Sequence, residues 1–136
     1  MTKWAAVVLA AVSLAACTKS TSSAASPTSP ATKTTDTFNG AVPVKSSDMH
    51  SFTVSAAGQV DITLTSTTPA GAALGLSVGT AAASGCSAVA GGSVVASAGS
   101  VAQLSGVLSP ATYCVALFDI GGQSQPVSYT VTVVHP

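Results

Sequence analysis

Hydrophobic and polar residues alternate with a period of two from Phe38 onward, and residues that favour turns interrupt the alternation. This pattern is typical of antiparallel strands with one buried face. It predicts strands at residues 37–44, 50–54, 59–66, 73–79, 93–98, 100–107, 112–118 and 126–134. Seven or eight short strands of this kind indicate an all-β domain over residues 38–136, an antiparallel β-sandwich with a jelly-roll-like fold.

The alternation also predicts which side chains form the core. Three segments each place large hydrophobic residues on a single face. The residues are Val60, Ile62 and Leu64 in the first segment, Leu74, Leu76 and Val78 in the second, and Tyr129, Val131 and Val133 in the third. Pro43 suits an edge strand, because proline cannot donate a ladder hydrogen bond. Residues 50–54 and 59–66 flank Ala56-Ala57-Gly58 and are expected to form a hairpin. The Gly-, Ser- and Ala-rich run 79–92 is expected to be a loop.

Residues 1–16 have the layout of a secretory signal peptide. Met1-Thr2-Lys3 supplies positive charge, and an apolar run of residues 4–14 follows. That run is too short for a transmembrane helix, which needs about 20 apolar residues. Leu14-Ala15-Ala16-Cys17 resembles the lipoprotein box of bacterial lipoproteins. The resemblance implies cleavage before Cys17 and acylation of its thiol.

Acylation of Cys17 would attach the chain to a lipid bilayer, since two or more acyl chains give stable anchoring. The residue after Cys17 is Thr18. In the resembled class an Asp at that place favours retention in the inner membrane, so in a bacterium with two membranes we expect the outer membrane. The alternative is an ordinary secretory signal that a cysteine happens to follow. Residues 17–37 are rich in Ser, Thr and Pro, and we expect a disordered tether there.

Cys86 and Cys114 are the two thiols that remain once Cys17 is acylated. Outside the cytoplasm an even number of cysteines is expected to pair. The sequence therefore predicts one disulfide, with a pair of buried free thiols as the alternative. Because the core is rich in Ala, a crosslink that stabilises by about 3 to 4 kcal/mol would matter here.

The charge of the chain excludes one class of function. Lys and Arg number 4 together, as do Asp and Glu, the formal net charge is zero, and all four cationic residues are lysines. Nucleic-acid binding depends on clustered Lys and Arg that neutralise phosphates. We therefore expect no nucleic-acid partner.

Few side chains carry the chemistry of a catalytic or metal site. His50 and His135 lie at the ends of predicted strands, and we interpret them as unrelated rim residues. A serine hydrolase would pair His50 with Asp48 or Asp119, but no nucleophile-elbow pattern accompanies them. Calcium requires about six oxygen ligands, whereas the acidic residues here are scattered. We expect no enzymatic activity, no cofactor and no metal.

Aromatic residues supply the one candidate for ligand contact. Phe52, Tyr113 and Tyr129 share the phase of core aliphatic residues, so we assign them to packing. Phe118 falls on the opposite face from Tyr113. Together with the adjacent Asp119 it is the candidate ligand contact, since sugar-binding sandwiches generally use exposed aromatic faces.

The predicted domain also resembles bacterial pre-peptidase C-terminal domains. The resemblance rests on residues 48–54, 58–64, 74–76, 109–115 and 129–133, which include Ser-Pro-Ala-Thr-Tyr-Cys-Val and Tyr-Thr-Val-Thr-Val. It implies a jelly-roll sandwich without catalytic activity that serves in substrate or matrix binding and in secretion. The chain departs from the pattern at Ala72-Ala73, where members often carry Asp, and at Ala111, where they carry Gly.

These observations predict a non-enzymatic lipoprotein of the cell envelope. Its partners would be the lipid bilayer, through acylated Cys17, and a protein or glycan that the residues do not identify. The sandwich would act as a binding or structural module. The alternative within the same frame is a carbohydrate or matrix-polymer recognition module, and a hydrolase that depends on His50 is a third, less favoured class.

Overall fold

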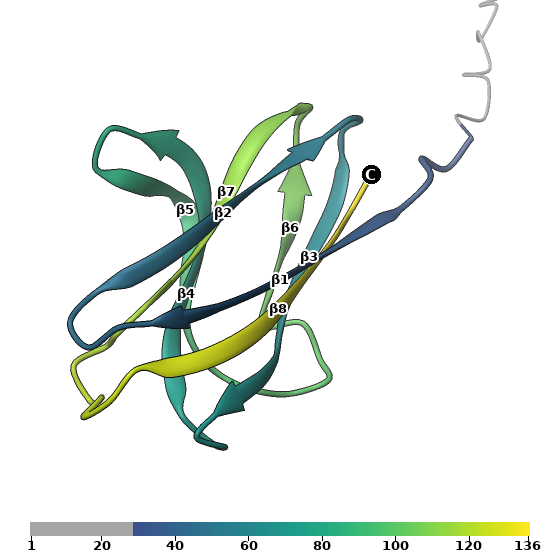
Figure 1. Cartoon of the computed structure of the whole chain (residues 1–136). Coiled ribbons are helices and arrows are strands. Elements are labelled where there is room, and N and C mark those ends of the chain that lie inside the picture. Colours follow the sequence, from purple (N-terminus) through teal and green to yellow (C-terminus); the bar gives the residue numbers. More distant parts are fainter. Residues whose placement is uncertain (1–28) are drawn as a thin grey trace, which may run out of the picture.

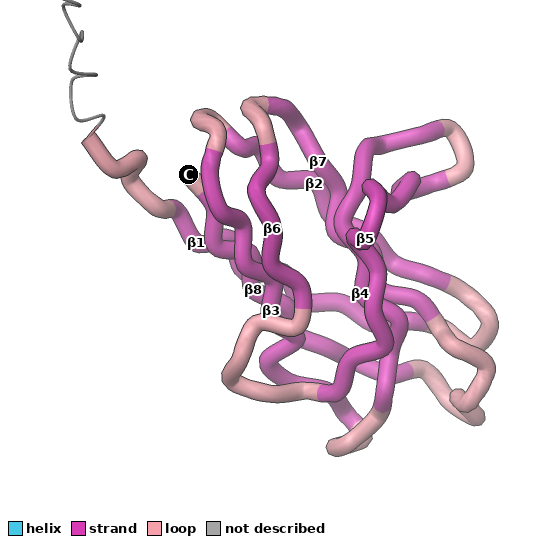
Figure 2. Tube along the Cα trace, turned by 180° about the vertical axis from the view of Figure 1, so that it is seen from behind, coloured by secondary structure: helices cyan, strands magenta, loops and turns pink. Residues whose placement is uncertain are grey.

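The computed structural model describes residues 29–136, which form eight strands and no helix (Figures 1 and 2). The strands are β1 (Thr34–Val42), β2 (Ser47–Val54), β3 (Gly58–Thr68), β4 (Ala73–Ala82), β5 (Gly85–Ser97), β6 (Leu104–Leu108), β7 (Ala111–Phe118) and β8 (Val127–His135). The described residues include no helix of the length and hydrophobicity that crossing a bilayer would require.

The strands form two antiparallel sheets of four that face one another. The first sheet has the order β1-β8-β3-β6 and the second has the order β2-β7-β4-β5. Strand β1 pairs with β8, β2 with β7, β3 with β6, and β4 with β5. The chain thus resembles one long hairpin wrapped into two layers, which is the jelly-roll arrangement. The predicted all-β sandwich is confirmed.

The core lies between the inner faces of the two sheets. Its most completely buried side chains are Ile62, Leu64, Leu74, Leu76, Leu117 and several valines. The aliphatic residues that the alternation assigned to one face are all buried, and the most exposed of them is Val78 at 7%. Phe52, Tyr113 and Tyr129 are also buried, with exposed fractions of 4%, 8% and 3%. Their assignment to packing is confirmed.

The first strand begins earlier than the sequence pattern indicated. Strand β1 starts at Thr34 and pairs along its whole length with β8, from Thr34 opposite His135 to Val42 opposite Val127. Residues 34–37 therefore belong to the sandwich and were wrongly assigned to the tether. The physical reason is that Thr34, Thr35 and Thr37 are β-branched residues that favour strands, and they pair with β8, which is distant in the sequence.

The predicted hairpin between residues 50–54 and 59–66 is wrong. Strand β2 lies in the second sheet and β3 in the first, so the turn at residues 55–57 crosses from one layer to the other. The backbone N–H of Ser55 donates to the oxygen of Pro136 at 3.0 Å and fixes this crossing. Both strands bury one face, and that pattern is the same for a hairpin and for an inter-sheet connection.

The predicted loop at residues 79–92 is also wrong, because most of this run belongs to the β4–β5 hairpin. Gly79 pairs with Ala88, while Ser77 pairs with Ser93, so β5 carries a bulge between these positions. A Cβ atom at Gly79 would collide with the backbone of Ser87. The run is rich in small residues because the two strands pack closely, and not because it forms a loop.

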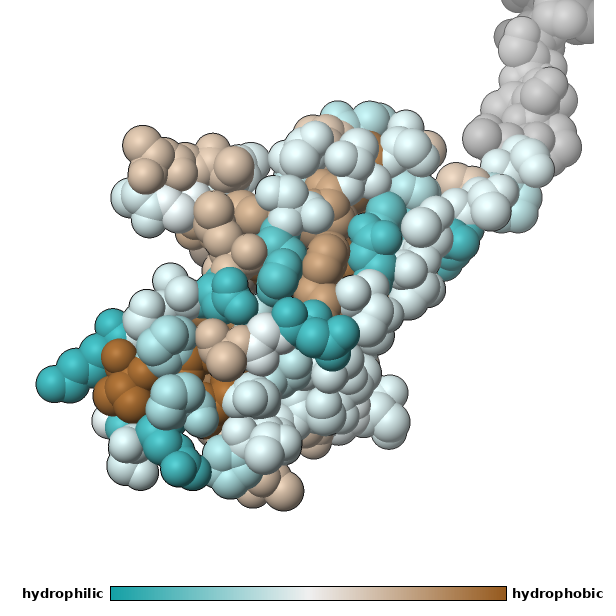
Figure 3. Space-filling model, viewed as in Figure 1, coloured by the Kyte–Doolittle hydropathy of each residue, from teal (hydrophilic) through white to brown (hydrophobic). Residues whose placement is uncertain are grey.

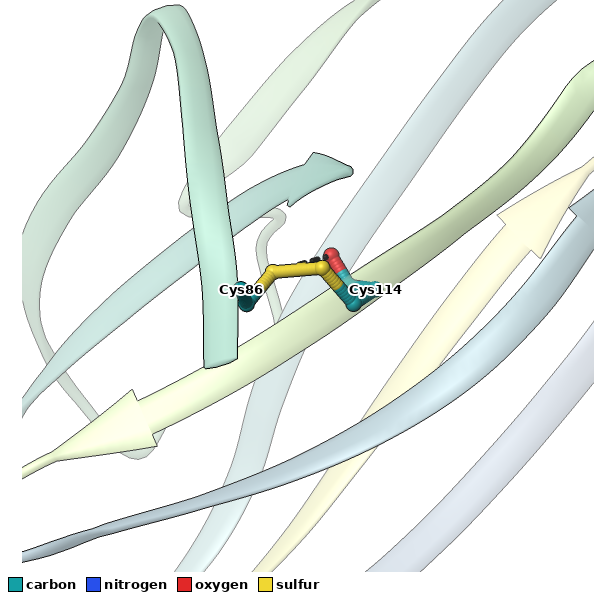
Figure 4. The surroundings of a disulfide bond; sticks show 2 residues. All are labelled: Cys86 and Cys114. Carbon is teal, nitrogen blue, oxygen red and sulfur yellow. Dashed lines mark hydrogen bonds between the residues drawn. A yellow bond between two sulfur atoms is a disulfide. The ribbon is translucent and has the colours of Figure 1, made fainter. Parts of the chain in front are cut away.

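The predicted disulfide joins Cys86 of β5 to Cys114 of β7, with their Cα atoms 5.8 Å apart (Figure 4). Cys114 has the phase of the outer face of the second sheet, yet it is fully buried. The end of the β4–β5 hairpin covers it, since Cys86 pairs with Ala81 near the hairpin tip. The crosslink therefore holds this hairpin end against β7.

Candidate functional site

The candidate ligand contacts lie at the end of the sandwich that is remote from the N-terminal segment. Strand β1 has nine residues and spans roughly 30 Å, and it leads from residues 29–33 to the turn at residues 43–46. That turn, the turn at residues 69–72 and the connection at residues 119–126 gather at the far end of the sandwich (Figure 1). We call this region the distal end. Cys17 lies outside the described residues.

Asp119 organises the distal end through its carboxylate. It accepts hydrogen bonds from the backbone N–H groups of Lys45 and Gly121, each at 2.7 Å. These bonds, that from Lys45 first, hold the pKa of Asp119 below its ordinary value. Lys45 and Gly121 both have positive φ angles, 59° and 94°. The carboxylate thus stabilises two tight backbone turns and joins the β1–β2 turn to the β7–β8 connection.

Phe118 is half-buried beside Asp119. Its ring occupies the space above Gly75 on the outer face of the second sheet, where a Cβ atom would collide with it. Phe118 lines a shallow polar hollow together with Lys45, Ser46, Ser47, Asp119 and Gly121. The structure therefore brings the two predicted contact residues together, with Phe118 offering part of its ring.

A second hollow at the distal end was not foreseen from the sequence. We call it the amide hollow, and its volume is about 260 Å³. It is lined by Pro69, Ala72, Ala73, Ile120, Gly122, Gln123, Ser124, Gln125 and Val127. None of these residues is charged. The run Gly121-Gly122 indicated only a turn, so no signal in the sequence pointed to a cavity here.

The side chain of Gln123 distinguishes the amide hollow from the other cavities. Both atoms of its amide, Nε2 and Oε1, are buried and form no hydrogen bond with any residue that the structure describes. A cavity of similar size, about 270 Å³, lies between β5 and β6, but no side chain that lines it carries such an atom. The distal end also holds the two predicted contact residues, Phe118 and Asp119.

His50 belongs to a hydrogen-bonded cluster between the two sheets. The hydroxyl of Tyr129 donates to Asp48 Oδ2 at 2.8 Å, and His50 Nε2 lies 2.8 Å from the same hydroxyl. Because the phenolic proton is used by Asp48, Nε2 must be the donor in the bond to Tyr129. Burial, assisted by the hydrogen bond to Asp48, raises the pKa of Tyr129 well above its ordinary value.

His135 forms a separate pair with Asp36. Its Nε2 atom lies 3.0 Å from Asp36 Oδ2, and its ring packs 5.4 Å from that of Phe52. His50 in turn stacks on Phe38 at 4.7 Å. Figure 3 shows this face, where hydrophobic side chains along the seam between β1 and β2 are flanked by hydrophilic ones.

The two histidines thus close the seam between the sheets, and each has its own carboxylate partner. Within residues 29–136 no hydrogen bond joins either imidazole to a serine hydroxyl. Within the same residues no three His, Cys, Asp or Glu side chains are grouped so that they could hold a metal ion.

Comparison with known proteins adds no further assignment. No protein-family model and no curated protein matches the chain. The resemblances to bacterial lipoproteins and to pre-peptidase C-terminal domains therefore remain predictions from the residues that carry them.

Proposed function

We propose that this protein is a lipid-anchored, non-enzymatic component of the bacterial cell envelope, and that its sandwich is a binding or structural module. The observation that supports this most is the direction of β1. This strand enters the sandwich at the end where residues 29–33 lie and runs its full length to the distal end. An anchor at Cys17 would therefore leave the loops of the distal end furthest from the bilayer.

The chemistry of the described side chains supports a non-enzymatic role. All four Asp side chains accept hydrogen bonds within the fold. Asp36 accepts from His135, and Asp48 accepts from Tyr129. Asp61 accepts from Ser105 and Gln59, and Asp119 accepts from the backbone N–H groups of Lys45 and Gly121. Cys86 and Cys114 are paired. These hydrogen bonds and the disulfide account for the carboxylates and the two cysteines through roles in the fold.

The sandwich is, in this proposal, a relative of the pre-peptidase C-terminal domains. The jelly-roll order of its strands agrees with what that resemblance implies. With Thr18 after Cys17, the outer membrane is the proposed location.

The anchor is tested by membrane fractionation of cells that produce the full chain. The wild-type chain is expected in the membrane fraction, and Cys17→Ala is expected to leave it. The double variant Cys86→Ser with Cys114→Ser is the matched control, because it replaces two cysteines without touching the proposed lipid site. If Cys17→Ala stays in the membrane fraction while the control behaves like the wild type, the proposal is wrong.

Recognition of a carbohydrate or matrix polymer is the second candidate function. It is favoured by the half-buried ring of Phe118, which borders a hollow lined by Ser46, Ser47 and the carboxylate of Asp119. An aromatic ring beside hydroxyl and carboxylate groups is the combination that binds sugars, since the ring covers apolar C–H groups while the polar atoms bond hydroxyls.

A further inference from the structure

The two edge strands on one side of the sandwich carry no charged side chain. Between Asp61 and Asp119 the sequence contains no Asp, Glu, Lys or Arg. That run includes β5 and β6, which lie together on the side of the molecule seen in Figure 2. We call this side, residues 85–108, the uncharged edge. The edge strands on the opposite side, β1 and β2, carry Asp36 and Asp48.

Hydrophobic side chains are most exposed at the uncharged edge. Val95 of β5, Val101 of the β5–β6 connection and Val107 of β6 have exposed fractions of 61%, 76% and 77%. The other exposed large hydrophobic side chains of residues 29–136 reach 45% at most. Exposed hydrophobic residues that gather in one region mark surfaces that a partner covers.

A hydrophobic hollow lies between the two sheets at the same edge. It is the cavity of about 270 Å³ between β5 and β6, and we call it the edge hollow. No charged residue lines it, and its hydrophobic walls include Val60, Val78, Val89, Leu104 and Leu108. Gly106 also lines the hollow, and a Cβ atom there would have no other atom within 4 Å. The inner side of β6 is therefore open at its middle residue.

Strand β6 has free backbone groups along one side. Among the described strands it pairs with β3 alone, so it presents a row of unpaired N–H and C=O groups. Edge strands are usually protected from further pairing by charged residues, proline or bulges. Pro43 follows β1 and a bulge interrupts β5, whereas β6 reads Leu-Ser-Gly-Val-Leu and pairs without a register shift. A further strand can therefore add to β6.

The chemistry of the uncharged edge limits what can cover it. Burial of an unpaired charge against a hydrophobic surface costs several kcal/mol, so a matching partner surface is itself uncharged. A second copy of the same edge meets this condition. Asp61 lies one strand in from the edge, where it accepts hydrogen bonds from Ser105 and Gln59 and lies 3.6 Å from Lys33 Nζ. Pairing at β6 leaves these contacts intact.

The sequence of β6 is also symmetrical about Gly106, with a leucine at each end. Opposite residues of an antiparallel pair project to the same face of the sheet, so a twofold axis must pass through a residue and not between two. An axis at Gly106 pairs all five residues of β6. It sets Leu104 of each copy opposite Leu108 of the other, and Ser105 opposite Val107.

We infer that two copies of this chain associate through antiparallel pairing of their β6 strands about a twofold axis at Gly106. The pairing joins the first sheets of both copies into one continuous sheet. Because the axis is perpendicular to that sheet, both second sheets lie on the same side of it, and the two edge hollows face one another. The leucine pairs then cover the hollows, and Val107 of each copy loses contact with water.

This arrangement is compatible with the proposed anchor but does not depend on it. Antiparallel pairing turns the two copies in opposite directions, so their N-terminal segments leave from opposite ends. Residues 18–33 number 33 − 17 = 16 and span up to about 55 Å when extended. That reach exceeds the roughly 30 Å spanned by β1. Both copies can therefore be attached to one membrane.

The experiment is disulfide crosslinking of the full chain in cell envelopes treated with a mild oxidant. Residues at a twofold axis have Cα atoms about 4.5 to 5.5 Å apart, which suits a disulfide. Gly106→Cys is therefore expected to give a covalent dimer of the chain. Gly122→Cys is the matched control, because a Cβ atom there also meets nothing within 4 Å. Its crosslinked fraction is expected to be at least tenfold smaller.

A pair of variants tests the register independently. Cells produce one chain with Ser105→Cys and a second, tagged chain with Val107→Cys. These two residues are exposed, and the axis sets them opposite one another. The mixed dimer is expected to form at least tenfold more than the dimer of either variant alone. Resistance of each variant to limited proteolysis shows that its sandwich is folded.

A charge at the edge is expected to prevent the association. Val107→Lys, combined with Gly106→Cys, is expected to lower the crosslinked fraction at least tenfold, since each copy brings an edge lysine to the pair. Met49→Lys in the same background is the control. Met49 is likewise an exposed hydrophobic residue on an edge strand, but it lies on β2 at the opposite side. This variant is expected to crosslink like Gly106→Cys alone.

Four results would overturn the inference. One is the absence of a covalent dimer from folded Gly106→Cys, and another is equal crosslinking at positions 106 and 122, which indicates random collision. The third is an equal effect of Val107→Lys and Met49→Lys. The fourth is crosslinking of Gly106→Cys to a different protein, which would assign the edge to that partner. Fractionation of Cys17→Ala tests the anchor separately, so either proposal can fail without the other.

Discussion

The hydroxyl of Tyr129 donates a hydrogen bond of 2.8 Å to the carboxylate of Asp48 across the two sheets. Tyr129 lies on β8 of the first sheet, and Asp48 lies on β2 of the second. Gly40 of β1 leaves room for this bond, because a Cβ atom there would lie 2.6 Å from the Tyr129 hydroxyl. The bond therefore joins the two layers at the seam between β1 and β2.

Replacing Tyr129 with Phe should destabilise the sandwich by about 1 to 3 kcal/mol, because a hydrogen bond to a charged acceptor is lost. Chemical denaturation of the wild type and the variant measures the difference. Tyr113→Phe is the control, since the Tyr113 hydroxyl donates to the Ser109 carbonyl, four residues before it, at 3.1 Å. Equal loss of stability in both variants would contradict a special role for the inter-sheet bond.

The same cluster predicts sensitivity to alkaline pH. Burial raises the pKa of Tyr129 above its ordinary value of about 10. The stability that Tyr129 contributes is therefore fully present below pH of about 10 and is lost as the pH rises further, because the unfolded chain ionises more readily. Tyr129→Phe should show a smaller alkaline loss of stability than the wild type. Parallel pH profiles would show that Tyr129 does not titrate in this way.

The close approach of β4 and β5 predicts that Gly79 tolerates no side chain. Gly79→Ala should destabilise the protein by about 2 to 3 kcal/mol, because its Cβ atom would collide with the Ser87 backbone, which cannot move aside like a flexible side chain. Gly106→Ala is the control, since nothing lies near a Cβ atom there. It should change stability by less than about 0.5 kcal/mol. Thermal unfolding of both variants distinguishes these outcomes.

Loss of the disulfide should weaken the fold considerably. The double variant Cys86→Ser with Cys114→Ser should unfold with about 3 to 4 kcal/mol less free energy than the wild type, because the crosslink restricts the unfolded chain. Amide hydrogen exchange should increase most in the hairpin end around Cys86. Uniform exchange throughout the sandwich would show that the bond does not specifically hold this hairpin.

Acid conditions should loosen the distal end through Asp119. Hydrogen bonds from Lys45 and Gly121 hold the pKa of the Asp119 carboxyl below its ordinary value. The stability that Asp119 contributes is therefore fully present at a pH above the ordinary pKa. It is lost as the pH falls through the lowered pKa of the folded state. Asp119→Asn should reduce the acid dependence of unfolding relative to the wild type. Gln125→Ala, which changes an exposed residue of the same connection, should leave it unchanged.

Local periodicity sufficed to predict the core, because buried residues such as Val131 and Val133 alternate with partly exposed residues along a single strand. Connections between strands were harder to predict. The residues of the turn after Val54 are compatible with a hairpin and with a connection between the two sheets. The pairing of β2 with β7, which is distant in the sequence, decides between them. Thr67 shows the same limit, since a bulge near Ser66 moves it onto the buried face.

The candidate site followed from the sequence only in part. Phe118 could be predicted because it is aromatic and out of phase with the core residues of its strand. Asp119 could be predicted because it follows Phe118 in the sequence. Gln123 did not, because its burial depends on how the β7–β8 connection packs against Pro69 and Ala72 of another turn. The pairing of His50 with Tyr129 likewise joins residues 79 positions apart.

The central claim is that the chain is anchored through lipid on Cys17. The most direct test is the mass of the N-terminal peptide from chain purified out of bacterial membranes. The account predicts a peptide that begins at Cys17 and carries the added mass of a diacylglyceryl group. A peptide that still contains Leu14-Ala15-Ala16, or one with an unmodified Cys17 thiol, would contradict it.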